Sequence, residues 1–199
     1  GTTLRWEGGN FASNPNGNAI RWGELYNFGF TTDAAPVDGE GRVGLFEGGG
    51  QLLEVIKVPG TGVETYCPAN VNSTGLGALS LPTVSTSIAD NDISILVTQL
   101  PTNSVGYFLM AQGQQQTPLG FSQGNLCVGD GSTTVYRFSQ TVLNSGFFGF
   151  VTFEPDLTNL PSGALVIAGD TWNFQYWFRD ANPMPTSNTS DAVSINFCE

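Results

Sequence analysis

Apolar and polar residues alternate most regularly near the C-terminal end of the chain. Trp172, Phe174, Tyr176 and Phe178 occupy every second position, and the positions between them are Asn173, Gln175, Trp177 and Arg179. A period of two with this many aromatic residues predicts a β-strand with one buried face. Gly-Asp before the segment and Asp-Ala-Asn-Pro after it are turn signals that bound the strand.

A weaker copy of this design lies at residues 23–30, where Tyr26, Asn27 and Phe28 correspond to Trp172, Asn173 and Phe174. The chain is therefore expected to contain two strands of one kind in two modules. The asparagine shared by both copies suits a structural role, because its amide can bond the backbone of a neighbouring turn.

The first 60 residues hold about four short strand patterns, at 2–6, 19–31, 42–46 and 52–58, with a turn region at 33–41. Four strands form a marginal sheet with one face still to cover. Residues 1–62 are therefore predicted to be a smaller, incomplete β-domain, or one that a partner completes.

The best domain boundary lies in the polar, turn-rich stretch 61–71. Beyond it, strand patterns recur at 78–85, 93–100, 106–111, 126–128, 135–142, 147–153, 165–167, 172–179 and 192–197, with a polar loop at 112–123. Short strands separated by turns predict an all-β fold, with an antiparallel, jelly-roll-like β-sandwich over residues 63–199.

Charge narrows the classes of partner. The chain carries 6 Lys plus Arg against 17 Asp plus Glu, a net charge of -11. Such a surface repels phosphate backbones and anionic membranes, so no nucleic-acid partner and no membrane insertion are expected. No apolar run is long enough to span a bilayer. With no signal peptide and Gly1 as the first residue, the chain is expected to be a processed or excised piece.

The absence of histidine removes the commonest general base and zinc ligand. Any chain with this many acidic residues contains carboxylates that could act in glycoside hydrolysis, but nothing in the sequence indicates which two would form the catalytic pair. The expectation is a protein that is not an enzyme and holds no cofactor.

Two weaker candidate sites remain. Asp90, Asp92 and Asp130 lie in oxygen-rich turns of the kind that Ca²⁺ prefers, although Asp also favours turns for its own sake. Trp177 falls on the face opposite Trp172, where it either stacks on a glycan or packs under a loop or against the other module.

An ordered set of motifs carries a family resemblance: YCPANVNSTG (66–75), GYF (106–108), QGNLCVG (123–129) and GDTWNFQYWFRD (169–180). It resembles a C-terminal module of large secreted proteins from planctomycetes, myxobacteria and related bacteria. Residues 4–56, with NPN (14–16), NAIRWG (18–23) and LYNF (25–28), resemble the end of a longer β-domain of similar proteins. The resemblance implies an extracellular or surface location, an all-β architecture and a first domain that lacks its N-terminal strands, and it implies no catalytic residues.

The resemblance also favours a disulfide between Cys67 and Cys127, since both lie in its motifs. Cys198 is then unpaired or intermolecular. Pairing of Cys67 with Cys198, or three reduced cysteines, are the alternatives.

The leading hypothesis is a non-enzymatic extracellular structural protein, a subunit of a bacterial cell-surface or filamentous structure that self-associates, or joins a neighbouring surface protein, through open strand edges. The alternative is a carbohydrate-binding or adhesive surface module with a polysaccharide partner.

Overall fold

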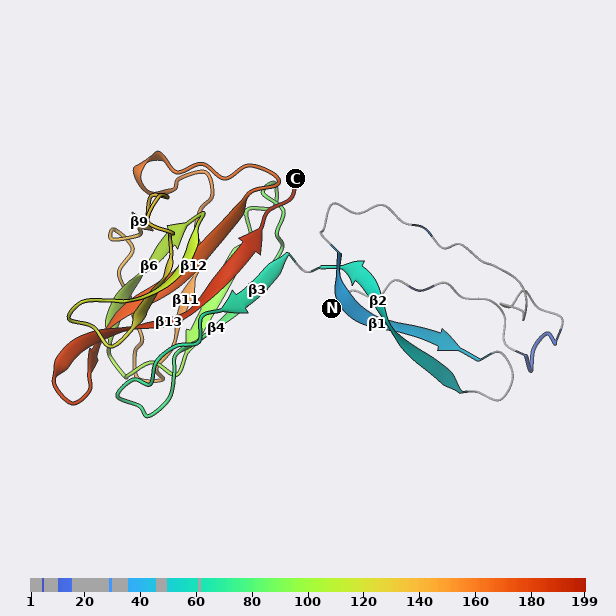
Figure 1. Ribbon diagram of the computed structural model, residues 1–199, viewed down its shortest axis with the longest axis horizontal. Coiled ribbons are helices and arrows are strands. Elements are labelled where there is room, and N and C mark those ends of the chain that lie inside the picture. The colour runs from blue at the N-terminus through green and yellow to red at the C-terminus, as the bar shows by residue number, and fades with distance from the viewer. Residues whose placement is uncertain (1–4, 6–10, 16–28, 30–35, 46–49, 61) are drawn as a thin grey trace. The chain divides into compact units, whose positions relative to one another are not determined.

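The computed structural model describes residues 5, 11–15, 29, 36–45, 50–60 and 62–199 (Figure 1). The chain divides into two compact units, Gly1–Gly60 and Thr61–Glu199, at a point beside the expected boundary at residue 62. The sheets are antiparallel, and one short 3-10 turn, η1 (Pro161–Gly163), is the helical element of the described residues. The predicted all-β sandwich fold is confirmed.

In the part of unit 1 that the structure describes, β1 (Pro36–Gly44) and β2 (Gln51–Pro59) form an antiparallel ladder, in register from Pro36 opposite Pro59 to Gly44 opposite Gln51. The predicted turn at 33–41 is wrong from residue 36 onward, since β1 begins there. The glycines of this segment suggested a turn, but in the structure Gly41 allows a close approach to a side chain of the neighbouring strand. A Cβ on Gly41 would lie 2.8 Å from Cδ1 of Ile56. Tyr26, Asn27 and Phe28 lie outside the described residues, as does nearly all of the predicted strands at 2–6 and 19–31.

Unit 2 is built from three sheets. The largest runs in the order β10 (Leu143–Asn144), β6 (Val105–Ala111), β12 (Thr171–Ala181), β13 (Pro185–Asn196), β3 (Val63–Tyr66), with β9 (Tyr136–Arg137) also paired to β6. The second runs β11 (Val151–Phe153), β5 (Ile93–Thr98), β4 (Leu79–Val84). The third is the pair β7 (Gln114–Pro118) and β8 (Asn125–Val128).

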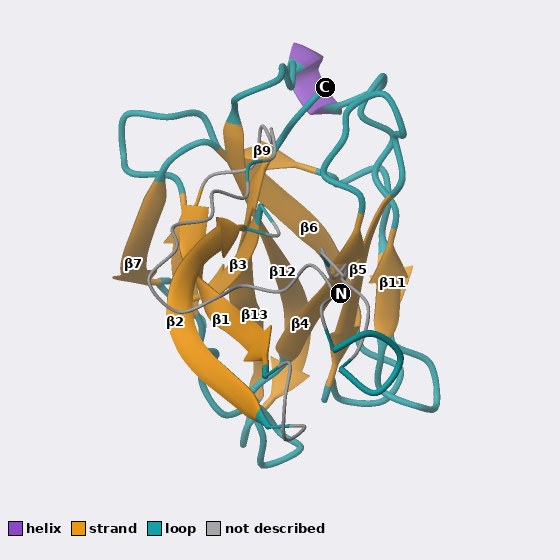
Figure 2. Ribbon diagram, turned by 90° about the vertical axis from the view of Figure 1, so that its right-hand side faces the viewer, coloured by secondary structure: helices purple, strands orange, loops and turns teal. Residues whose placement is uncertain are grey.

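The alternation on β12 sets the layering. Trp172, Phe174, Tyr176 and Phe178 are buried in the main core with the apolar residues of β5 and β11, as predicted for one face of this strand. On the neighbouring strand, Phe108 stacks on Phe153 with ring centroids 4.1 Å apart, which joins the first two sheets. The opposite face of β12 meets the β7–β8 pair, and Figure 2 shows β5 and β11 on one side of β12 and β7 on the other.

Five segments differ from the sequence prediction. β13 begins at Pro185 rather than 192, β7 occupies part of the predicted polar loop at 112–123, and the 165–167 segment forms no strand. The pattern at 147–153 becomes a strand at Val151, and the pattern at 135–142 yields the two residues of β9. Polar strands were missed because their burial depends on hydrogen-bond partners that are distant in sequence.

Candidate interaction surfaces

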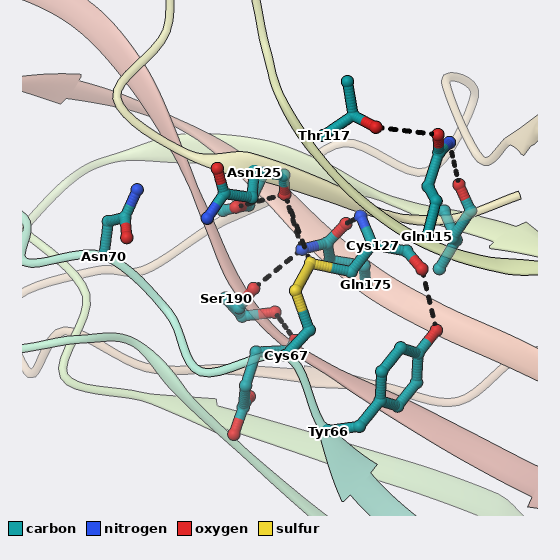
Figure 3. The surroundings of a disulfide bond; sticks show 12 residues. Tyr66, Cys67, Asn70, Gln115, Thr117, Asn125, Cys127, Gln175 and Ser190 are labelled. Atoms are coloured by element: carbon teal, nitrogen blue, oxygen red, sulfur yellow. Dashed lines mark hydrogen bonds between the residues drawn. A yellow bond between two sulfur atoms is a disulfide. The ribbon is translucent and has the colours of Figure 1, made fainter. Parts of the chain in front are cut away.

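The predicted disulfide is present. Cys67, directly after β3, is bonded to Cys127 on β8, with their Cα atoms 6.2 Å apart (Figure 3). Pairing of Cys67 with Cys198 and a fully reduced set are therefore both wrong. Cys198 is a free, half-buried thiol whose Sγ lies 3.5 Å from Oγ1 of Thr86. The bridge ties the edge of the largest sheet to the β7–β8 pair.

A polar network surrounds the disulfide (Figure 3). Gln175 on β12 is fully buried; its Oε1 accepts from the backbone N–H of Cys127 at 2.9 Å, and its Nε2 donates to the carbonyls of Asn125 and Ser190. The hydroxyl of Tyr66 donates to the carbonyl of Cys127 at 3.0 Å, and burial raises the pKa of Tyr66. Each of these hydrogen bonds joins two protein groups from different strands, so the network holds the layers together.

Asn173 has the structural role expected of it. Its Nδ2 donates to the carbonyls of Ala111, Gln112 and Gly113 at 2.9–3.1 Å, and its Oδ1 accepts from Nε2 of Gln114 at 2.9 Å. One side chain thus fixes the turn between β6 and β7, which places the third sheet over β12.

Trp177 packs within the protein. Its ring lies 5.0 Å from that of Tyr107 on β6, and the guanidinium of Arg179 lies 5.1 Å from its centroid. The indole is half-buried beside Leu109, Ala111 and Val128. Because Arg179 occupies part of the ring face, Trp177 offers little open area for stacking; binding of a glycan there stays a prediction.

The calcium candidates are turn residues at separate places. Oδ1 of Asp130 accepts from the backbone N–H and hydroxyl groups of Ser132 and Thr133, and these bonds hold the pKa of Asp130 far below its usual range. Asp90 accepts from the hydroxyl of Ser85, and Asp92 is exposed on the same turn. No group of three or more metal-binding side chains occurs within the described ranges. A calcium site stays a prediction.

An open groove with a volume of about 470 Å³ lies between the outer strands of two sheets, lined by residues of β3, β4 and β13. Asp191 reaches it with a side chain only 8% exposed, and Oδ1 of this residue accepts from the backbone N–H of Ser80 at 2.7 Å. Burial raises the pKa of Asp191, although hydrogen bonds from Ser80 oppose the shift. No sequence motif marked this carboxylate, because its burial depends on a contact to a residue 111 positions away.

The β1–β2 ladder of unit 1 exposes apolar side chains on both faces. Leu53 and Val55 lie on one face, where Val55 is 73% exposed, and Leu52 and Ile56 lie on the other. Arg42 donates to Glu40 across from Leu53 and Val55, so these two charges form a pair on that face. A two-stranded ladder with uncovered apolar faces is marginally stable alone and is suited to pairing or packing with a further element.

Searches of protein-family models, curated proteins and solved structures found no match to this chain. Among the residues that the structure describes, no helix has the length and apolar composition needed to cross a membrane. The fold and surfaces define an all-β protein of two units, one a three-sheet sandwich and the other carrying an exposed ladder.

Proposed function

We propose that this protein is a non-enzymatic extracellular structural protein, a subunit of a bacterial cell-surface or filamentous assembly that joins its neighbours through the β1–β2 ladder. The observation that carries the proposal is the exposure of Leu52, Leu53, Val55 and Ile56 across both faces of β2. Covering this apolar surface with a strand or sheet face of a neighbouring subunit removes it from water, and added strands strengthen a sheet.

The disulfide supports an extracellular location, because such bonds persist in oxidising surroundings. Only 12% of the residues are charged, which leaves much of the surface to uncharged polar and apolar groups. Glu40 and Arg42 on the Leu53 face of the ladder form an ion pair, so a neighbouring subunit would cover these two charges as a pair.

The carbohydrate-binding alternative depended on Trp177. Since that ring packs against Tyr107 and under Arg179, the described surfaces support assembly better than stacking on a sugar. Saturable binding to a polysaccharide that is lost in Trp177→Ala would reverse this order.

The test is the assembled state of the full chain, measured by electron microscopy and light scattering under non-reducing conditions. Wild-type protein should form oligomers or filaments, and Leu53→Lys with Val55→Lys should shift it toward monomer, because buried, unpaired ammonium groups oppose packing. Leu165→Lys, which charges an exposed apolar residue of unit 2, is the matched control and should assemble normally. A wild-type monomer, or assembly that ignores the β2 substitutions, would refute the proposal.

A further inference from the structure

Unit 2 has two unlike ends. At one end of the sandwich, which we call the terminal end, the first and last residues of unit 2 lie together. The backbone N–H of Asn196 donates to Gly62, and Ile195 pairs with Val63. We call the opposite end of the sandwich the loop end. Five connections form it: β3–β4 (67–78), β5–β6 (99–104), β7–β8 (119–124), β10–β11 (145–150) and β12–β13 (182–184). Figure 1 shows the β12–β13 turn, in red, at the end of unit 2 opposite the C-terminus.

The loop end presents large apolar side chains to solvent. Phe147 and Phe148 are 80% and 81% exposed, Phe121 is 104% exposed and Met184 is 72% exposed. They come from three different connections, so the feature belongs to the whole end and not to a single loop. Large exposed apolar side chains that gather at one end of a domain indicate an interaction site.

Phe121 is the most informative of them. Its backbone lies in the left-handed region, with φ of 62°, which disfavours a residue that carries a Cβ. Its ring is fully exposed, so packing within this chain does not offset the strain. Hydrogen bonds of the turn, from the N–H of Leu119 to Gly124 and from that of Ser122 to Leu119, hold this conformation, so the ring is displayed at a fixed place.

The loops that carry the rings are held in place. The backbone N–H of Leu100 donates to Gly149, that of Asn103 to Gly146 and that of Ser145 to Ser104, all at 2.8–2.9 Å. Gly149 is required there, because a Cβ would lie 2.4 Å from the carbonyl oxygen of Leu100. These loops therefore display Phe147 and Phe148 in a fixed arrangement, and these backbone groups need no water partner when the end is covered.

Charge is segregated away from the loop end. Its five connections contain no Asp, Glu, Lys or Arg. The nearest acid, Asp180, is buried and accepts from the backbone N–H groups of Ser73 and Ala181, and the adjacent Arg179 lies over Trp177. The loops of the terminal end carry the carboxylates Asp90, Asp92, Asp130, Glu154, Asp156 and Asp170.

The arrangement of the aromatic rings favours a lipid surface over a sugar chain or a flat protein face as the ligand. Phe147 and Phe148 are inclined at 84°, whereas Phe148 and Phe150 are inclined at 28°, so the three rings of this connection do not lie in the single plane on which a sugar chain stacks. Fully exposed, protruding rings also suit a deformable surface better than a flat protein face. A lipid surface fits both features of the loop end. It accepts apolar side chains that enter it separately, and the exposed carboxylates at the other end of the unit stay away from it.

We propose that the loop end seats peripherally on a lipid bilayer with net uncharged head groups, with Phe121, Phe147, Phe148 and Met184 entering the boundary between head groups and acyl chains. Zwitterionic lipid is the expected partner because the net charge of -11 opposes approach to an anionic surface. The site lies wholly in unit 2 and does not depend on assembly through β1–β2.

The test is flotation of the full chain with phosphatidylcholine vesicles. Wild-type protein should float, and Phe147→Ser with Phe148→Ser should weaken binding at least tenfold. Leu165→Ser with Ile167→Ser removes two exposed apolar side chains from the terminal end and should leave binding unchanged. Failure of wild type to float, or equal binding of both double variants, would overturn the proposal.

The variant Phe121→Asn provides a second test, which does not depend on whether the double variant folds. Asparagine tolerates the left-handed conformation, so the variant should bind vesicles less while melting no lower than wild type. Two results would reject lipid as the partner. A dimer that forms without lipid and is abolished by Phe147→Ser with Phe148→Ser would indicate a second copy of the chain. Retention of wild type on an insoluble polysaccharide, lost in the same double variant, would indicate a glycan. Val55→Lys should still float, which distinguishes this site from the assembly surface.

Discussion

The side-chain oxygen of Gln175 accepts a hydrogen bond from the backbone N–H of Cys127 at 2.9 Å, so a buried, uncharged side chain on β12 holds the strand that carries the disulfide. The same amide donates to Asn125 and Ser190. A single residue thereby satisfies three backbone groups in two different strands, β8 and β13.

Gln175→Leu should destabilise unit 2 by about 3–5 kcal/mol, since it leaves buried backbone groups without partners at roughly 1–3 kcal/mol each. Chemical denaturation followed by tryptophan fluorescence measures the change. Gln116→Leu, at an exposed position of β7, is the matched control and should lie within about 0.5 kcal/mol of wild type. Equal stability of the two variants would show that the network around the disulfide is dispensable.

Replacing both Cys67 and Cys127 by serine should cost about 4 kcal/mol, because the bridge closes a loop of 60 residues in the unfolded chain. Cys198→Ser should have little effect on unfolding of the monomer, since that thiol is free. Denaturation midpoints with and without a reductant check both expectations: reduction should lower the midpoint of wild type and of Cys198→Ser, and leave the double variant unchanged.

Asp191 should make stability depend on pH in an unusual direction for a carboxylate. Its pKa is raised in the folded protein, so the folded state binds the proton more tightly than the unfolded state. The stabilisation from this proton is complete below the unfolded value of 3.8 and is lost as pH rises through the folded pKa. At neutral pH the buried charge therefore opposes folding.

Asp191→Asn should consequently be more stable than wild type at pH 7, with a difference that shrinks as the pH falls toward 4. The amide oxygen can still accept from the backbone N–H of Ser80. Thermal unfolding at several pH values measures this, with the exposed Asp92→Asn as the control for loss of one negative charge. A variant less stable than wild type at pH 7 would contradict the assigned direction.

Two phenylalanines should respond in opposite ways to the same truncation. Phe108→Ala should destabilise by about 3–5 kcal/mol, because this ring is buried and stacks on Phe153. Phe148→Ala should change stability by no more than about 0.5 kcal/mol, because the ring is exposed. A large loss in Phe148→Ala would mean that the loop end serves the fold, which would remove the ground for assigning it a partner.

The alternation at residues 172–179 determined the strand and its buried face, because a period of two places alternate side chains on opposite faces whatever the neighbouring strands are. Asn173 was also identified from sequence alone, since its repeat in a second strand pattern indicated a structural role. The pairing of Cys67 with Cys127 followed from the motif resemblance, and the structure contains it.

Tertiary structure decided the features that depend on distant partners. The polar start of β13 is buried because Asn188 donates to Val71, Thr189 to Asn125, and Ser190 accepts from Tyr176. The Phe147–Phe148 pair resembles a core strand in sequence, yet hydrogen bonds to the β5–β6 connection hold it at the surface. Local pattern specifies which side of a segment is apolar; only the packing of segments far apart in the chain specifies whether that side is covered.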